Sequence, residues 1–151
     1  PAYQAIMDGD IPQVRLPEQA GSLRVIAGEY AGEKGPAHTF SPLQVWDIRL
    51  QAGGRSQWTL PEGWNVALVL LQGELTVNGE NVLRAAQMLV LDAAAQDFSI
   101  EAHSDAVLLL LSGEPLDEPI VGYGPFVMNT EAEIQQAIAD FRSGRFGQME
   151  Q

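Results

Sequence analysis

The chain has 151 residues, of which 46% are apolar and none is cysteine, and its formal net charge is −12. This length and apolar content suit one domain with one hydrophobic core. The lack of cysteine excludes disulfides, thiolate catalysis and zinc sites built on cysteine. The negative charge argues against nucleic acid or an anionic membrane as a partner. No apolar run has the length of a membrane helix and the first residues do not resemble a leader, so we expect a soluble, cytoplasmic protein.

The first 22 residues are predicted to form an extended N-terminal arm. Ile11 and Leu16 each precede a proline, and a residue before proline favours β or polyproline II geometry. The apolar run from Leu23 to Ala27 then predicts a strand that ends at Gly28.

A series of short strand patterns follows, with no helical pattern between them. The expected strands are 45–50, 56–60, 65–72, 74–77, 87–91, 98–100 and 106–111. Asn78-Gly79 is the dipeptide that type I′ hairpin turns favour. Strands at this spacing indicate a sandwich or barrel, and jelly-roll closure is one way in which such sheets protect their edges.

One helix is predicted, at 129–144. Thr130 and Glu133 form a capping box, and Gly144 is a plausible stop. The apolar residues that share one face of this helix are Ile134, Ala137, Ile138 and Phe141. The sequence therefore predicts an all-β jelly-roll barrel with one C-terminal α-helix, as a single domain over 1–151.

Several segments carry a family resemblance. They are 25–28, 35–42, 50–73 with Asn78-Gly79, 111–120 and 124–130, the most specific being Ser112-Gly113-Glu114-Pro115-Leu116-Asp117-Glu118-Pro119. Together they resemble the C-terminal cupin domain of the pirin family and span nearly the whole chain. The opening, 3–12, looks like the segment that joins the two pirin domains.

The resemblance implies a cupin fold without a metal site of its own. Pirins are two-domain cupins whose iron is held in the N-terminal barrel by three His and one Glu. Members are described as transcription cofactors, as redox-sensing nuclear proteins in animals and, in some bacteria, as quercetin 2,3-dioxygenases. This chain begins where the N-terminal barrel would end, so the resemblance carries over no catalytic residue and predicts no cofactor here.

The general cupin motifs can be laid on the sequence by their spacing. Gly54 and Gly73 take the first and last positions of the first motif, and Gly79 begins the second. The metal-ligand positions then fall on Leu60, Glu62, Val66 and Val90. Leucine and valine have no lone pairs to offer a metal, and Glu62 follows a proline in a turn. We expect Leu60, Val66 and Val90 to point inward as packing residues, beside Leu68 and Leu89.

The two histidines do not occur at a spacing that is typical of metal ligands. His38 precedes a strand and His103 lies in a polar turn, so each is expected to be exposed or hydrogen-bonded. The alternative is that they meet in space and bind a metal with Asp47 or Asp105, although no His-x-His pattern supports it.

Aromatic residues offer candidates for a pocket or an interface. Trp46, Trp58 and Trp64 could line a flavonoid-like pocket, but Trp58 shares a strand face with Leu60, which favours core packing. Trp64, beside a turn glycine, is expected to be the most exposed of the three. Tyr123 and Phe126 lie in a Gly- and Pro-containing loop that is expected to be fixed by a buried Phe126, with a contact role as the alternative.

The sequence is consistent with two functions. The first is a non-catalytic structural or interaction module that forms a homodimer or docks to a second cupin domain, since exposed apolar surface tends to be covered by association. The alternative is a quercetin 2,3-dioxygenase-type oxidoreductase or a small-molecule-binding cupin, which would need metal ligands from outside this chain.

Overall fold

The computed structural model describes residues 4–92 and 97–147. Contacts group the chain into two compact units, a barrel from Gln4 to Pro115 and a smaller C-terminal unit from Leu116 onward. The single domain expected over 1–151 stays a prediction.

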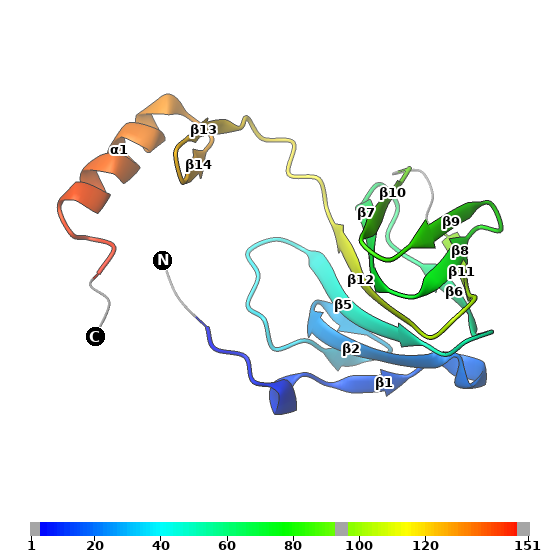
Figure 1. The fold of residues 1–151 in the computed structure, drawn as a ribbon. Helices are drawn as coiled ribbons and strands as arrows, with labels where there is room; N and C mark the ends of the chain where they lie inside the picture. The colour runs from blue at the N-terminus through cyan, green and yellow to red at the C-terminus, as the bar shows by residue number, and fades with distance from the viewer. Residues whose placement is uncertain (1–3, 93–96, 148–151) are drawn as a thin grey trace. The chain divides into compact units, whose positions relative to one another are not determined.

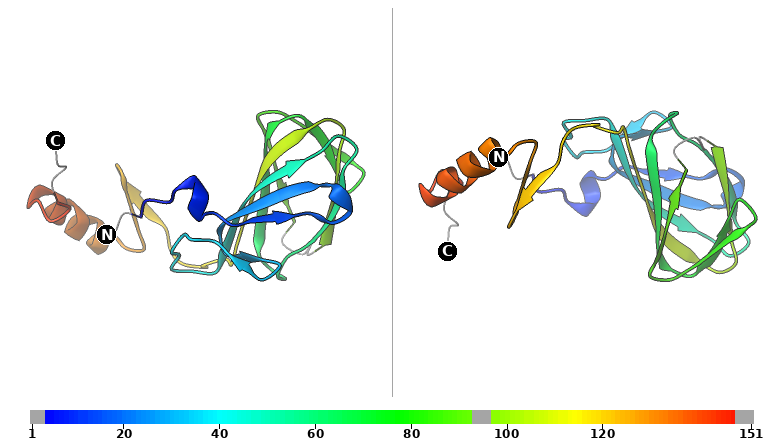
Figure 2. Two further views of the ribbon diagram at one scale, coloured as in Figure 1. Left: turned by 90° about the horizontal axis from the view of Figure 1, so that it is seen from below. Right: turned by 90° about the horizontal axis from the view of Figure 1, so that it is seen from above.

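Two antiparallel sheets form the barrel, as Figures 1 and 2 show. The six-stranded sheet has the order β1 (Gln13–Arg15), β2 (Gly21–Ala27), β5 (Leu43–Leu50), β12 (Ala106–Gly113), β7 (Asn65–Gln72) and β10 (Gln87–Leu91). The four-stranded sheet has the order β6 (Arg55–Thr59), β11 (Asp97–Ala102), β8 (Glu74–Val77) and β9 (Asn81–Arg84). Strands distant in sequence are neighbours here, because β12 lies between β5 and β7.

The core lies between the two sheets and follows the alternation of each strand. In β12, Ala106, Leu108 and Leu110 are buried, while Val107 and Leu109 alternate with them at intermediate exposure. The largest fully buried side chains are Phe98, Leu23, Ile48, Leu68, Leu70, Leu75, Ile100, Leu108 and Leu110. Because side chains alternate between the faces of a strand, every second residue of the sheets points into the barrel.

One hairpin was predicted from the sequence, and a second was not. Asn78 and Gly79 both have positive φ, as a type I′ turn requires, and they join β8 to β9. A second, short hairpin of β3 (Glu29–Tyr30) and β4 (Glu33–Lys34) follows β2.

The predicted N-terminal arm is more structured than an extended segment. It contains two 3-10 helices, η1 (Asp8–Asp10) and η2 (Pro17–Gln19), and the strand β1, which pairs with β2 at the edge of the sheet. Leu16 and Ala20 in this segment are buried in the core. The proline pattern predicted extended geometry, but it does not reveal that the chain turns back through η2 and pairs β1 with β2, the next strand.

The C-terminal unit contains β13 (Val121–Tyr123), β14 (Phe126–Met128) and α1 (Glu131–Arg142). The capping box of Thr130 and Glu133 is confirmed, with Thr130 as the N-cap. Phe126 is half-buried rather than buried, and its ring lies 6.3 Å from that of Phe141 and 6.1 Å from that of Phe146. Across 4–92 and 97–147, no helix is both long and apolar enough to cross a membrane. The predicted class, all-β with one C-terminal helix, is confirmed.

Candidate functional site

The two glycines at the ends of the first cupin motif, Gly54 and Gly73, are required by close backbone contacts. A Cβ on Gly54 would lie 2.7 Å from the carbonyl oxygen of Ala20. A Cβ on Gly73, which has φ +90°, would lie 2.3 Å from the carbonyl oxygen of Asp105. No side chain fits at either distance without a backbone shift. The motif's glycines therefore serve the fold of this barrel.

The ligand positions of the first motif are divided between the core and the surface. Leu60, directly after β6, and Val66 on β7 are buried members of the core cluster, 4% and 2% exposed. Glu62 lies in the turn between these strands and is exposed. Two of the three positions thus hold aliphatic side chains packed among their neighbours, and the third points to water.

Val90 does not point inward as the spacing predicted; it is 63% exposed. Directly opposite residues of an antiparallel pair share one face, and β10 pairs with β7 so that Leu89 lies opposite Leu68 and Val90 opposite Ala67. Since Leu68 is fully buried, Leu89 takes the inward position and Val90 the outward one. Leu89 packs against the core cluster, as expected.

The histidines and acidic residues do not come together as a metal site. His103 shares a 2.6 Å hydrogen bond with the Thr76 hydroxyl, and His38 is exposed. Asp105 accepts a hydrogen bond from the backbone N–H of Ala52. Asp47 is buried, and its Oδ2 accepts from Arg24 Nε at 3.1 Å. Within 4–92 and 97–147 no three His, Asp or Glu side chains are grouped so that they could hold a metal ion, so these residues offer no ligand set like the one that holds iron in the N-terminal barrel of pirins.

An aromatic cluster fills one part of the barrel interior. The ring of Trp46 lies 5.1 Å from that of Tyr30 and 5.9 Å from that of Trp58, and Trp58 stacks on Phe98 at 6.5 Å. Trp46 and Trp58 are 4% and 3% exposed. The core position expected for Trp58 is confirmed, and its indole N–H donates to the Ser56 hydroxyl at 2.8 Å.

Burial raises the pKa of the Tyr30 phenol above its ordinary value of 10.0. The unfolded chain ionises this group first, so the free energy of unfolding should be fully retained below about pH 10 and decline as the pH rises toward the folded-state pKa. We expect Tyr30→Phe to reduce this alkaline loss, measured by urea unfolding at several pH values from neutral to alkaline. The same alkaline slope in both proteins would contradict the prediction.

The other aromatic candidates lie apart from one another. Trp58 and Tyr30 border a cavity of about 380 Å³, together with Arg55 and Ser56. Trp64 is half-exposed, the most exposed tryptophan as expected, and borders a shallow hollow of about 280 Å³. Tyr123, in the C-terminal unit, is 66% exposed. The barrel candidates Trp58 and Trp64 therefore do not share a pocket.

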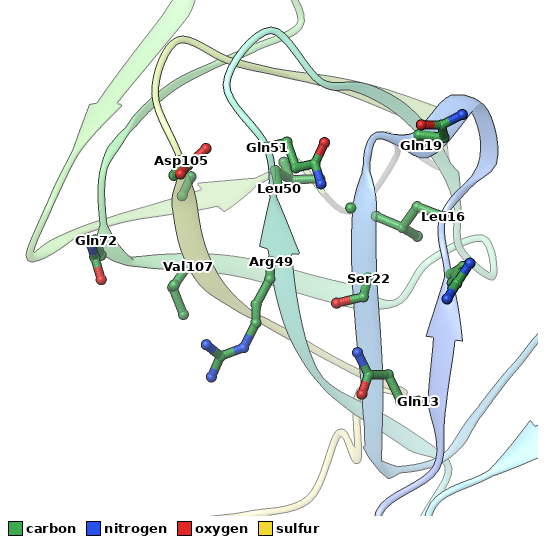
Figure 3. Close-up of a pocket in the computed structure, with 13 residues that line it drawn as sticks. Gln13, Leu16, Gln19, Ser22, Arg49, Leu50, Gln51, Gln72, Asp105 and Val107 are labelled. Atoms are coloured by element: carbon green, nitrogen blue, oxygen red, sulfur yellow. The ribbon is translucent and has the colours of Figure 1, made fainter.

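A hollow that was not predicted lies on the outer face of the six-stranded sheet (Figure 3). It has a volume of about 870 Å³. One row of residues crosses the sheet, with each residue opposite the next on the neighbouring strand. The row consists of Arg15 on β1, Ser22 on β2, Arg49 on β5 and Val107 on β12. Gln13, Gln19, Gln51 and Gln72 add amide groups to the lining. Sequence alone could not identify this groove, because it depends on which strands pair and in what register.

The groove offers hydrogen-bond donors in an otherwise acidic protein. The Nη2 atom of Arg49 lies 3.6 Å from Asp47 Oδ2, and the Arg49 side chain remains 58% exposed. Guanidinium groups bind carboxylates and other oxygen-rich groups through paired N–H donors. No histidine lines the groove. Its lining, which also includes Asp105, offers guanidinium and amide donors that suit the binding of a polar, oxygen-rich ligand.

Comparison with known proteins gives a consistent family assignment. Residues 45–147 match the pirin C-terminal cupin domain. A Pseudomonas aeruginosa protein named as a putative quercetin 2,3-dioxygenase is 54% identical over 97% of this chain and 51% of its own length. Human pirin is 30% identical over 97% of this chain and 51% of its own length.

Solved structures agree with this assignment. The crystal structure named quercetin 2,3-dioxygenase from Acinetobacter baumannii is 49% identical, with a TM-score of 0.89 over 99% of this chain and 52% of that chain. The chain thus spans about half the length of the relatives that it matches.

Proposed function

The chain belongs to the pirin family through its C-terminal cupin domain, and we propose that it is one half of an oxidoreductase of the quercetin 2,3-dioxygenase type. The observation that carries this proposal is the 54% identity, over 97% of the chain, to the Pseudomonas aeruginosa protein of that name. Identity at this level extends over the barrel and the C-terminal unit, and it exceeds the 30% shared with human pirin.

In this proposal the chain supplies a packed barrel and no metal ligands. Leu60 and Val66 occupy ligand positions with buried aliphatic side chains, and Val90 faces outward. The metal, and the residues that hold it, would come from outside this chain. The same proposal places the protein in the cytoplasm, with neither nucleic acid nor a membrane as its partner, in keeping with its charge of −12.

A second role, as a non-catalytic interaction module, is favoured by a specific observation. Gly54 and Gly73 of the first cupin motif are required by backbone contacts, while the ligand positions hold core or surface residues. A barrel that has the cupin fold but no metal-ligating side chains at these positions is suited to supporting another protein domain or docking to it. Homodimerisation and docking to a second cupin domain are the two forms of this role.

A chimera tests the oxidoreductase proposal. This chain would replace the matching half of the Pseudomonas aeruginosa relative, and loss of quercetin absorbance and oxygen uptake would be followed with added Fe(II) or Mn(II). We expect the chimera to turn over quercetin within about tenfold of the parent, because the exchanged halves are 54% identical over 97% of this chain. The present chain alone should show no turnover.

The controls separate a misfolded chimera from a wrong proposal. A chimera that is monodisperse and metal-loaded, yet inactive beside an active parent, would contradict the proposal. Inactivity of the parent towards quercetin would contradict the assigned reaction. Turnover by this chain alone that is lost in Glu62→Ala would show that a degenerate ligand position acts as a true ligand.

A further inference from the structure

One row of side chains in the groove places two arginines on either side of a serine hydroxyl. Arg15 on β1 lies opposite Ser22 on β2, and Ser22 lies opposite Arg49 on β5. We propose that this row binds the acidic group, a carboxylate or a phosphate, of a small hydroxylated acid. In this site the remaining polar side chains of the groove contact the hydroxyl groups of the same acid.

The three residues of the row stand on one face of the sheet. Directly opposite residues of an antiparallel pair share a face, and all three line the groove. Neighbouring strands lie about 4.8 Å apart, so the Cα atoms of Arg15 and Arg49 are roughly 10 Å apart, with Ser22 midway between them. Figure 3 shows the Ser22 hydroxyl and the Arg49 side chain on the same side of their strands. Two long arginine side chains can therefore reach one anion above the Ser22 hydroxyl.

Arg15 is the only lysine or arginine of residues 4–92 and 97–115 without an ion pair. Each of the other such side chains in this range has a carboxylate oxygen within 4.0 Å, and these are Arg24, Lys34, Arg49, Arg55 and Arg84. The chain has 20 acidic residues, yet none of those described approaches Arg15. The N–H donors of its guanidinium group are thus left for water or a ligand.

Arg49 also has donors to spare. Its Nη2 atom lies 3.6 Å from Asp47 Oδ2, which is longer than a hydrogen bond, and the same oxygen accepts from Arg24 Nε at 3.1 Å. Asp47 is 7% exposed, so a ligand in the groove meets the guanidinium group and not this carboxylate. An anion shared by Arg15 and Arg49 gains charge-assisted hydrogen bonds, which are about twice as strong as neutral ones. The row therefore selects an acidic group over a neutral one.

The rest of the lining suits hydroxyl groups. Amide side chains both donate and accept hydrogen bonds, as hydroxyls do, and the groove has four of them, Gln13, Gln19, Gln51 and Gln72. Asp105 directly precedes β12, which is separated from β1 by β2 and β5. It accepts one hydrogen bond, from the Ala52 N–H, and its other lone pairs can accept from a ligand. Because Asp105 repels a second acidic group, the favoured ligand has its charge at the Arg15 end and hydroxyls towards Asp105.

The net charge of −12 lowers the affinity for an anion but does not exclude binding. The charged residues that line the groove are Arg15, Arg49 and Asp105, so its local balance is positive. At physiological ionic strength, exposed charges more than about 8 Å away are largely screened. The contacts are open to solvent, so we expect a dissociation constant of about 0.5 to 5 mM.

Nuclear magnetic resonance titration of the full chain tests the proposal, at an ionic strength of about 0.15 M. Gluconate and sorbitol phosphate present similar hydroxyls with a carboxylate or a phosphate, and sorbitol is the matched neutral probe. We expect at least one of the two acids to shift the backbone amide signals of Arg15, Ser22 and Arg49. Sorbitol should bind at least tenfold more weakly. The acid that binds more tightly identifies the acidic group of the ligand.

Variants of the row separate this site from general attraction to the chain. Arg15→Gln and Arg49→Gln should each weaken binding of the tighter acid at least tenfold, because each removes a charge-assisted contact. Ser22→Ala should weaken it about twofold to tenfold. Arg55→Gln is the control, because the Arg55 side chain is 74% exposed and lies on β6 of the other sheet. It makes the same change in net charge and should leave binding unchanged. The spectra also report whether each variant is folded.

Each outcome decides for or against the site. The proposal would be overturned if neither acid shifted the groove signals at up to about 50 mM, or if sorbitol bound as tightly as the acids. Binding that either folded variant, Arg15→Gln or Arg49→Gln, leaves unchanged would place the acid elsewhere and also overturn it. The titration involves neither metal nor turnover. An inactive chimera therefore leaves this site standing, and an absence of binding leaves the oxidoreductase proposal standing.

Discussion

Replacing Leu60 with alanine is expected to lower the free energy of unfolding by about 2 to 5 kcal/mol. Leu60 occupies a metal-ligand position of the cupin spacing, but it is 4% exposed and belongs to the core cluster with Trp58. Removing one buried methine and two buried methyl carbons loses their transfer free energy and leaves a cavity that the surrounding side chains fill only in part. Urea unfolding of the two proteins measures the difference.

Glu62→Ala is the matched control, because it changes a second ligand position of the same motif. Glu62 is exposed in a turn, and such substitutions usually alter stability by less than about 0.5 kcal/mol. Comparing the two variants tests whether Leu60 and Glu62 are ordinary core and surface residues or belong to a site that has lost its metal. If Leu60→Ala were as stable as the parent, the region around Leu60 would be loosely packed and could accommodate a ligand.

The strands with clear alternation or firm turn signals were predicted well from sequence. Residues 65–72, 74–77 and 87–91 form strands with the predicted bounds. Asn78-Gly79 marks its hairpin, and Thr130 caps its helix. These features are decided by local chemistry, namely side-chain periodicity, tolerance of positive φ and a side-chain bond to a free N–H.

Features that depend on pairing between distant strands were not predicted. Val90 was placed inward by counting along one strand, but its orientation is set by the register of β10 on β7, where Leu89 faces the buried Leu68. A shift of one residue moves a whole strand to the opposite face. The groove around Arg49 has the same origin, since it gathers residues from β1, β2, β5, β7 and β12.

Gly73→Ala is expected to destabilise the barrel by at least about 3 kcal/mol, which combines a residue forced to positive φ with overpacking. Gly73 has φ +90°, and an added Cβ would meet the Asp105 carbonyl at 2.3 Å, a backbone atom that cannot move aside alone. Gly79→Ala is the control, because Gly79 also has positive φ (+69°) with no atom within 4 Å of its Cβ position. It should cost only about 1 to 2 kcal/mol, again by urea unfolding. Equal losses in the two variants would mean that the close contact at Gly73 relaxes freely. A larger loss at Gly73 would mean that the barrel needs a glycine here for backbone packing. This need would explain why the glycine spacing of the cupin motif is present although its ligand positions hold leucine and valine.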